Sequence, residues 1–277
     1  MNSGSYSWTV SLFAVREQLF MFLKGLLKLS ENELIFYERI GNWDFSKIKC
    51  KSINLVDWDF YEKIRQYTDE TSLCLDLGTG GGERALENYP NVGMIIGSDY
   101  SKSMIKTANE NKRGTSKRIK FVVMDSLKMA FPHGILDLVS ARHTIFQAKQ
   151  IYDSLVPGGI LIIEGVDKTD CWELKKTFGR GQSYTDNIAP SVRDYQAIID
   201  AGFTVLEETE IITNEYYETS DDLLALLLKT PIIDEFIGTN DKIKTELDLL
   251  KGYIQANQTS EGILLKRVSY GIIAQKI

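Results

Sequence analysis

The sequence contains few residues of the kinds that build metal centres and disulfides. It has 2 histidines, 3 cysteines and 5 prolines among 277 residues. Two histidines, His133 and His143, exclude a histidine-rich metal centre, and we expect no metal. The cysteines form no Cys-x-x-Cys pair, and their odd number fits a reduced interior better than a disulfide framework. The scarcity of proline argues against a proline-rich linker between domains.

Long uncharged hydrophobic runs are also missing. The most apolar stretch, Trp8–Leu29, is interrupted by Arg16, Glu17 and Lys24, whereas a bilayer span needs about 18 or more apolar residues. We therefore expect no membrane span. The first residues show no basic leader followed by a small-residue cleavage signal, so a cytoplasmic location is expected.

The chain has fewer basic than acidic residues. The chain has 32 Lys and Arg against 38 Asp and Glu, a net charge of −6. Nucleic-acid binders usually carry a basic surface that displaces counterions from phosphates, so nucleic acid is disfavoured as a partner, although a small local basic pocket stays open. The hydrophobic share of 43% and the charged share of 25% are those of an ordinary globular protein with one sizeable core.

The N-terminal segment differs in pattern from the rest of the chain. The apolar spacing within Trp8–Leu29 predicts a helix with a broad apolar face, and residues 30–56 are mixed and loop-like. The helix would pack on the core or on a neighbouring subunit, which allows a homodimer. A membrane-surface position is the alternative, although the polar face has few basic residues. We interpret residues 1–56 as an N-terminal helical lid.

Strand and helix signals alternate regularly from Trp58 onward. The expected strands are Leu73–Leu77, Val92–Ser98, Ile119–Met124, Ile135–Ser140 and Ile160–Val166, and the expected helices are Trp58–Tyr67, one from about Gly82, Ser101–Asn111 and Lys149–Leu155. The strands are nearly continuous runs of Val, Ile and Leu, as buried parallel strands are. This order predicts right-handed βαβ crossovers and a Rossmann-like α/β fold with helices on both faces of the sheet.

The last third of the chain extends this sheet. A helix at Ser191–Ala201 is followed by two strands, Thr204–Thr213 and Leu264–Lys276. The helical segment between these strands is too long for a hairpin turn, so we interpret it as a helical cap at about 215–262, inserted before the last strand. Residues 57–277 would then form one domain around a seven-stranded, mostly parallel sheet, with a loop at Cys171–Tyr184.

A glycine-rich turn, Gly78-Thr-Gly-Gly-Gly82, follows the first of these strands. Glycines there permit positive φ and close approach of a ligand, and the next helix presents free N–H groups to an anion. Gly80 and Gly82 with Ala85 match a dinucleotide fingerprint, with Asp99 at a suitable distance. Asp76 favours a different ligand, because a carboxylate suits an ammonium and a sulfonium better than a pyrophosphate.

Five ordered segments resemble the motifs of class I S-adenosylmethionine (SAM)-dependent methyltransferases. They are Asp76–Gly82, Gly97–Met104, Val123–Ser126, Asp137–His143 and Leu155–Ile163, and Val268–Lys276 resembles the final reversed strand. The form of the glycine turn, the Arg142-His143 pair and the Trp43-Asp-Phe and Trp58-Asp-Phe elements resemble a bacterial small-molecule subgroup. The resemblance implies methyl transfer from SAM to a small-molecule acceptor, at oxygen or carbon, with S-adenosylhomocysteine as product.

The resemblance also implies which residues bind the cofactor. These are Asp76, Gly78, Thr79, Gly80, Gly82, Asp99, Tyr100, Met104, Asp125, Ser126 and Arg142. Asp99 would accept both ribose hydroxyls, with a helix N-cap as the alternative role. Tyr100 and Met104 would cover the adenine, although core packing equally explains Met104. Asp125 would accept from the adenine amino group, with Ser126 beside it.

The remaining assignments concern the acceptor. Methyl transfer needs a base only where the acceptor loses a proton, and His143 is the candidate for this catalytic role, with a structural histidine as the alternative. Arg180 and Tyr184 would bind an anionic substrate group, unless Arg180 is simply solvated. Three other functions stay open: a methyltransferase acting on RNA or protein, an NAD(P)-dependent oxidoreductase, and a non-catalytic SAM-fold binding module.

Overall fold

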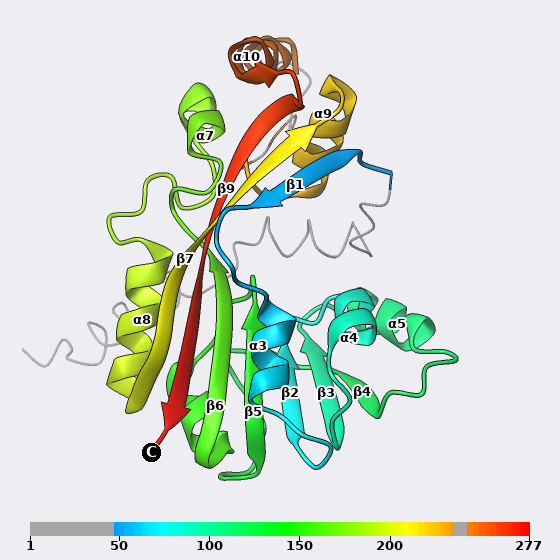
Figure 1. Cartoon of the computed structure of the whole chain (residues 1–277), viewed down its shortest axis with the longest axis vertical. Helices are drawn as coiled ribbons and strands as arrows, with labels where there is room; N and C mark the ends of the chain where they lie inside the picture. Colours follow the sequence, from blue (N-terminus) through cyan, green and yellow to red (C-terminus); the bar gives the residue numbers. More distant parts are fainter. Residues whose placement is uncertain (1–46, 235, 237–242) are drawn as a thin grey trace, which may run out of the picture. The chain divides into compact units, whose positions relative to one another are not determined.

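The computed structural model describes residues 47–234, 236 and 243–277, which belong to the second of the two units into which the chain divides, residues 38–277 (Figure 1). The predicted helix at Trp8–Leu29, the Trp43-Asp-Phe element and most of the predicted lid lie outside the described residues. No helix in the described ranges is long and apolar enough to cross a membrane.

Five parallel strands form one half of the sheet. They are β2 (Leu73–Leu77), β3 (Met94–Asp99), β4 (Ile119–Val123), β5 (Leu136–Arg142) and β6 (Leu155–Val166), in the spatial order β4-β3-β2-β5-β6. Most of their apolar residues are buried because helices cover both faces, whereas Val122 and Val123 of the edge strand β4 are exposed. All five predicted strands are confirmed, and β6 begins earlier than predicted because the Pro157-Gly-Gly turn lies in a bulge of the strand.

Antiparallel strands complete the sheet. β9 (Gly262–Lys276) lies between β6 and β7 (Phe203–Tyr217), and β8 (Gln258–Thr259) pairs with the start of β9. The end of β7 pairs with β1 (Cys50–Asn54). The described residues therefore form a 9-stranded sheet, not the predicted seven. The prediction of a loop at 50–54 was wrong because every residue of this edge strand is exposed, so no hydrophobic alternation marks it.

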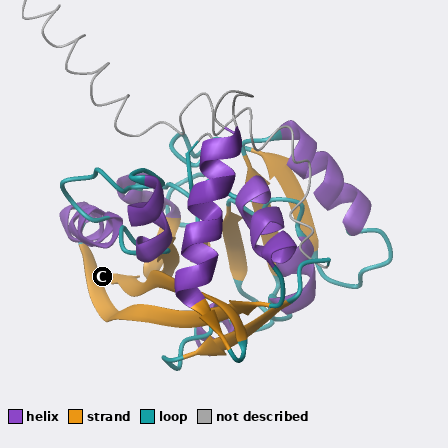
Figure 2. Cartoon of the chain, turned by 90° about the horizontal axis from the view of Figure 1, so that it is seen from above, coloured by secondary structure: helices purple, strands orange, loops and turns teal. Residues whose placement is uncertain are grey.

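Helices pack on both faces of the sheet, as predicted (Figures 1 and 2). One face carries α3 (Phe60–Gln66), α4 (Glu83–Asn88) and α5 (Lys102–Asn111), and the other carries α6 (Ala148–Ser154) and α8 (Pro190–Ala201). Ser101 is the N-cap of α5, and its Oγ accepts a hydrogen bond from the backbone N–H of Met104 at 3.3 Å. This confirms the predicted start of that helix.

Three further helices form a cap over the ends of β7 and β9 (Figure 1). They are α7 (Trp172–Phe178), α9 (Ser220–Lys229) and α10 (Ile243–Asn257). The helical insertion before the last strand is confirmed, although β7 runs to Tyr217. The prediction of a loop at Cys171–Tyr184 was wrong, because seven residues of helix between left-handed Cys171 and Gly179 are too few to show a helical period.

The carboxyl ends of β2 to β6 lie on one edge of the sheet, and the cap lies toward the same end (Figure 1). The chain passes from β2 to β3 and β4 on one side and then returns to β5 on the other side. Open α/β sheets bind ligands at such a switch point, outside the carboxyl ends of the strands. The fold therefore predicts that the loops following these strands form the ligand-binding site.

Candidate functional site

The glycine turn between β2 and α4 requires glycine at several positions. Gly78, Gly80 and Gly82 have φ of 69°, 58° and 77°. A Cβ atom on Gly78 would lie 2.6 Å from Cβ of Thr144, and one on Gly82 would lie 2.7 Å from Cζ of Phe121. Gly78 and Gly82 are therefore both left-handed and closely packed against their neighbours, so a side chain is excluded at these two positions.

Asp99 ends β3 beside this turn. Its Oδ2 accepts a hydrogen bond from the backbone N–H of Gly80 at 3.0 Å, and its Oδ1 accepts one from the N–H of Ser101 at 2.9 Å. Burial raises the pKa of Asp99, against these two backbone hydrogen bonds. The N-cap of the next helix is Ser101, so the alternative N-cap role for Asp99 was wrong. A carboxylate can accept about four hydrogen bonds, so Asp99 retains capacity for a ligand.

Asp76 and Thr79 are polar side chains of the turn region with oxygen atoms that can still form hydrogen bonds. Asp76 is buried and accepts a hydrogen bond from Oγ of Ser140 at 2.8 Å. Burial raises the pKa of Asp76 to about 6, although the hydrogen bond from Ser140 and the charge of Arg142 lower it. Oγ1 of Thr79 is buried and has no hydrogen-bond partner among the described residues. Buried polar atoms are normally satisfied, so these groups fit a polar ligand.

The residues assigned to the adenine lie in different environments. Tyr100 is 52% exposed, whereas Met104 is 2% exposed. Oδ1 of Asp125 accepts a hydrogen bond from the backbone N–H of Leu127 at 2.9 Å, and Asp125 and Ser126 are half-buried. The burial of Met104 agrees with the packing alternative. The cofactor contacts of these four residues remain predictions.

The structure adds Glu164, a residue of β6 that the sequence analysis missed. Its Oε1 accepts a hydrogen bond from Nε of Arg142 at 2.9 Å and lies 3.3 Å from Nε2 of His143. Its Oε2 accepts one from Nε1 of Trp58 at 3.1 Å. Burial would raise the pKa of Glu164, but the hydrogen bond from His143 and the charge of Arg142 hold it at about 2. A carboxylate within an apolar strand was the signal available in the sequence.

His143 and Arg142 follow from the end of β5. His143 has a φ of 52°, which is uncommon outside glycine, and its backbone N–H donates to the carbonyl oxygen of Glu164 at 2.8 Å. Desolvation and the charge of Arg142 lower the pKa of His143, and Glu164 acts in the opposite direction. The terminal amino groups of Arg142 have no hydrogen-bond partner among the described residues, and its side chain is 34% exposed.

Arg180 and Tyr184, the predicted substrate residues, contact other side chains and backbone groups in the region of the cap. Nε of Arg180 donates to the carbonyl oxygen of Asp234 at 2.8 Å, and one terminal amino group pairs with the buried carboxylate of Glu246. The ring of Tyr184 lies 5.2 Å from that of Trp172. Arg180 is therefore not a solvated loop residue, and its role toward a substrate stays a prediction.

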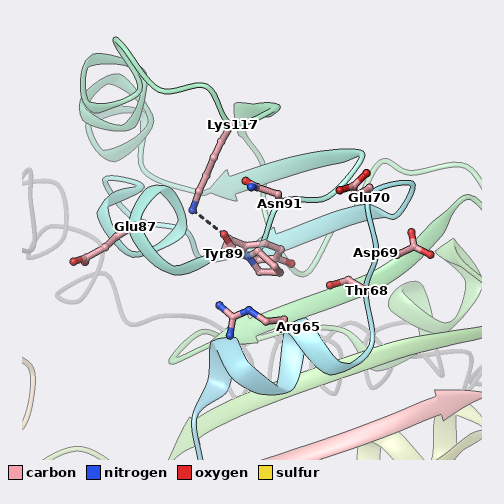
Figure 3. A pocket seen from close by; sticks show the side chains of 9 residues that line it. Arg65, Thr68, Asp69, Glu70, Glu87, Tyr89, Asn91 and Lys117 are labelled. Atoms are coloured by element: carbon pink, nitrogen blue, oxygen red, sulfur yellow. Dashed lines mark hydrogen bonds between the residues drawn. The ribbon is translucent and has the colours of Figure 1, made fainter.

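A hollow at the opposite end of the sheet is a poor candidate for the site (Figure 3). Residues around the amino ends of β2, β3 and β4 line it, including Arg65, Glu70, Asn91 and Lys117. Nζ of Lys117 donates to the backbone carbonyl oxygens of Tyr89 at 2.7 Å and Ala85 at 3.3 Å, which explains its inward position. The glycine turn, Asp99 and Glu164 all belong to the other end.

Comparisons with known proteins relate the central part of the chain to methyltransferases. Residues 75–163 match the model of a family described as a methyltransferase domain. This match supports the assignment of this segment to the class I SAM-dependent methyltransferases. A methyltransferase family implies SAM as the cofactor. The resemblance to methyltransferases that the sequence motifs indicated is thus confirmed.

Individual relatives match parts of the chain. Phosphoethanolamine N-methyltransferase 1 of Arabidopsis thaliana is 27% identical over 157 residues, which are 53% of this chain and 31% of that protein. Ribosomal protein L11 methyltransferase of Thermus thermophilus is 31% identical over 139 residues, which are 48% of this chain and 46% of that protein. The chain thus spans less than half the length of these two curated relatives.

A solved structure supports the fold. The crystal structure of a candidate methyltransferase from Bacillus halodurans matches with a TM-score of 0.55 and 19% sequence identity. The match covers 78% of this chain and 98% of that chain. At this identity it establishes the methyltransferase fold alone, which agrees with the predicted Rossmann-like sheet.

Proposed function

We propose that this protein transfers the methyl group of SAM to a small-molecule acceptor at oxygen or carbon. The observation that supports this most directly is the gathering of the glycine turn, Asp99 and the Arg142–His143–Glu164 cluster at the carboxyl ends of adjacent strands. The register pairs Arg142 with Glu164 and Leu77 with Ala141, so the glycine turn and the cluster follow neighbouring strands.

The residues present fit SAM. The glycine turn admits a ligand close to its backbone, and Asp99 has lone pairs left for two ribose hydroxyls. Asp76 and the unpaired hydroxyl of Thr79 offer acceptors for an ammonium group. The terminal amino groups of Arg142, which have no hydrogen-bond partner in the part of the chain that the structure describes, suit the carboxylate of the same ligand, because a guanidinium matches carboxylate geometry. SAM, when bound, supplies a methyl group already activated by its sulfonium.

This chain's own residues would then orient and deprotonate the acceptor. His143 is neutral near pH 7 because its pKa is lowered, so it can accept a proton from an oxygen or an acidic carbon. Trp58 and the cap would limit the access of water to this edge of the sheet. We propose a small molecule as acceptor because a net charge of −6 does not favour a polyanion.

A protein acceptor is the second candidate. The Thermus thermophilus relative is named for ribosomal protein L11, and the Arabidopsis thaliana relative for phosphoethanolamine. One name thus refers to a small-molecule acceptor and the other to a protein acceptor. Both relatives match this chain over less than half of their own length.

The experiment is calorimetric titration of the full chain with SAM, S-adenosylhomocysteine and NAD⁺, followed by an acceptor screen that records S-adenosylhomocysteine release. We expect one equivalent of either sulfur ligand to bind and NAD⁺ to give no heat. Small phenols, carboxylates and amines form one arm of the screen, and ribosomal protein preparations form the other. Tight binding of NAD⁺ without binding of SAM would refute the proposed function.

A further inference from the structure

The Glu164 carboxylate is buried at the end of β6, where an ionised group needs several donors. Its residue is 8% exposed, and desolvation of an unpaired carboxylate costs several kcal/mol. Oε2 is bound by the indole N–H of Trp58. Trp58 is itself fixed, because it is buried and packs so closely on Gly271 of β9 that a Cβ there would lie 2.3 Å from the indole Cζ2. This leaves Oε1 for the groups at the end of β5.

Oε1 determines which nitrogen of His143 carries the proton. Glu164 is ionised at neutral pH and can therefore only accept hydrogen bonds. The ring atom of His143 closest to this carboxylate is Nε2, which lies 3.3 Å from Oε1 in an ion-pair contact, so the ionised carboxylate favours a neutral imidazole with its hydrogen on Nε2. Nδ1 is then the nitrogen with a free lone pair. Because the backbone N–H of His143 also donates to the carbonyl of Glu164, one residue restrains both the backbone and the ring.

We propose that Glu164 is a positioning residue that holds His143 as the Nε2–H tautomer, with Nδ1 free to accept the acceptor's proton. This inference rests on the proposed methyl transfer. The proton would pass from the acceptor to Nδ1, and the acceptor's electron pair would bond to the methyl carbon. The electron pair of the broken C–S bond would stay on sulfur in S-adenosylhomocysteine. The imidazolium would face the negative charge of Glu164 and later release its proton to water.

Two positive charges near His143 oppose its protonation, and the Glu164 carboxylate counteracts them. Arg142 on β5 and Arg267 on β9 both disfavour the imidazolium, and Glu164 on β6 opposes them. Arg267 is largely neutralised by Asp170, which it contacts through Nε at 2.9 Å, and by Glu215 at 3.3 Å. Glu164 also accepts a hydrogen bond from Nε of Arg142 at 2.9 Å. Its removal should therefore affect both neighbours.

The test is ¹⁵N NMR of the two histidines in the full-length protein. The sequence contains 2 histidines, and the variant His133→Asn assigns the signals. We expect His143 to show a single Nε2–H tautomer at pH 7.5 and a pKa below its usual value. In Glu164→Gln, we expect a mixture of tautomers and a lower pKa still, because the negative charge has gone. A wild-type His143 in the Nδ1–H form, or averaged between tautomers, would overturn the proposal without any variant.

Kinetics with an identified acceptor provide the second readout. We expect Glu164→Gln to lower kcat by at least about tenfold, on the scale of lost base catalysis, and to shift the acidic limb of the pH profile to lower pH. Glu173→Gln is the matched control, because Glu173 is an exposed glutamate of α7 that pairs with Lys176. An unchanged pH profile in folded Glu164→Gln would reject the positioning role. Failure of wild-type protein to bind SAM would instead reject the proposed function, while the tautomer result stands.

Discussion

Asp99 stabilises the glycine turn as well as offering a ligand site. Its two oxygens accept the N–H groups of Gly80 and Ser101. We predict that Asp99→Ala weakens SAM binding by about 2–3 kcal/mol, the scale of lost hydrogen bonds to a charged group, and also lowers the melting temperature. Asp99→Asn should lose less stability, because the amide oxygen can still accept from one N–H. Calorimetric titration and thermal unfolding measure the two effects, and full SAM affinity in folded Asp99→Ala would contradict the assignment of the ribose site.

Asp76 should make both cofactor binding and stability depend on pH. Burial raises its pKa from 3.8 to about 6, so the folded protein holds the proton more tightly than the unfolded chain. The stabilisation from this group is complete below pH 3.8 and is lost as the pH rises through about 6. SAM binding should show the opposite trend, because an ammonium needs the ionised carboxylate, and affinity should rise about tenfold between pH 5 and 7.

The variant Asp76→Asn tests this assignment, because an amide does not titrate. Titration calorimetry from pH 5 to 8 should give a flat SAM affinity for the variant and a rising affinity for the wild type. His143→Asn serves as a control for a second group that titrates nearby, and it should leave the rise in place. A rise that survives in Asp76→Asn would assign the pH dependence to another group.

At the level of elements, the junction of β2 with α4 depends on the space around Gly82. Gly82 is the N-cap of α4 in a left-handed conformation, and a Cβ there would meet the ring of Phe121 on β4. Gly114 is a matched control, since its φ is 87° and a Cβ would meet nothing within 4 Å. We predict that Gly114→Ala loses about 1 kcal/mol from left-handed strain. Gly82→Ala should lose about 1–3 kcal/mol more from overpacking. Urea unfolding measures both losses, and equal values would show that the close packing is unimportant.

The same elements show what a sequence can predict here. Strands β2 to β6 were predictable because buried parallel strands are continuous apolar runs. Asp76 and Asp99 could be chosen as candidate ligand residues because they lie within the last two residues of such strands, beside a glycine turn. The short helix α7 and the exposed strand β1 have no periodic pattern to detect. The partners of Glu164 could not be predicted, because they depend on the register of β5 with β6 and on Trp58, 106 residues away in the chain.

For the whole molecule, ligand binding and unfolding are linked. A ligand that binds the folded state alone stabilises it by about 2.7 kcal/mol when its concentration is 100 times its Kd. For a domain of this size, each kcal/mol raises the melting temperature by about 2–4 °C. We therefore predict that S-adenosylhomocysteine at this concentration raises the melting temperature by about 5–10 °C. NAD⁺ at the same concentration should leave it unchanged, because Asp76 is unfavourable beside a pyrophosphate. Thermal unfolding monitored by fluorescence measures the shift, with Asp99→Ala as the negative control. An equal shift in that variant would show that the ligand binds away from the carboxyl ends of β2 and β3.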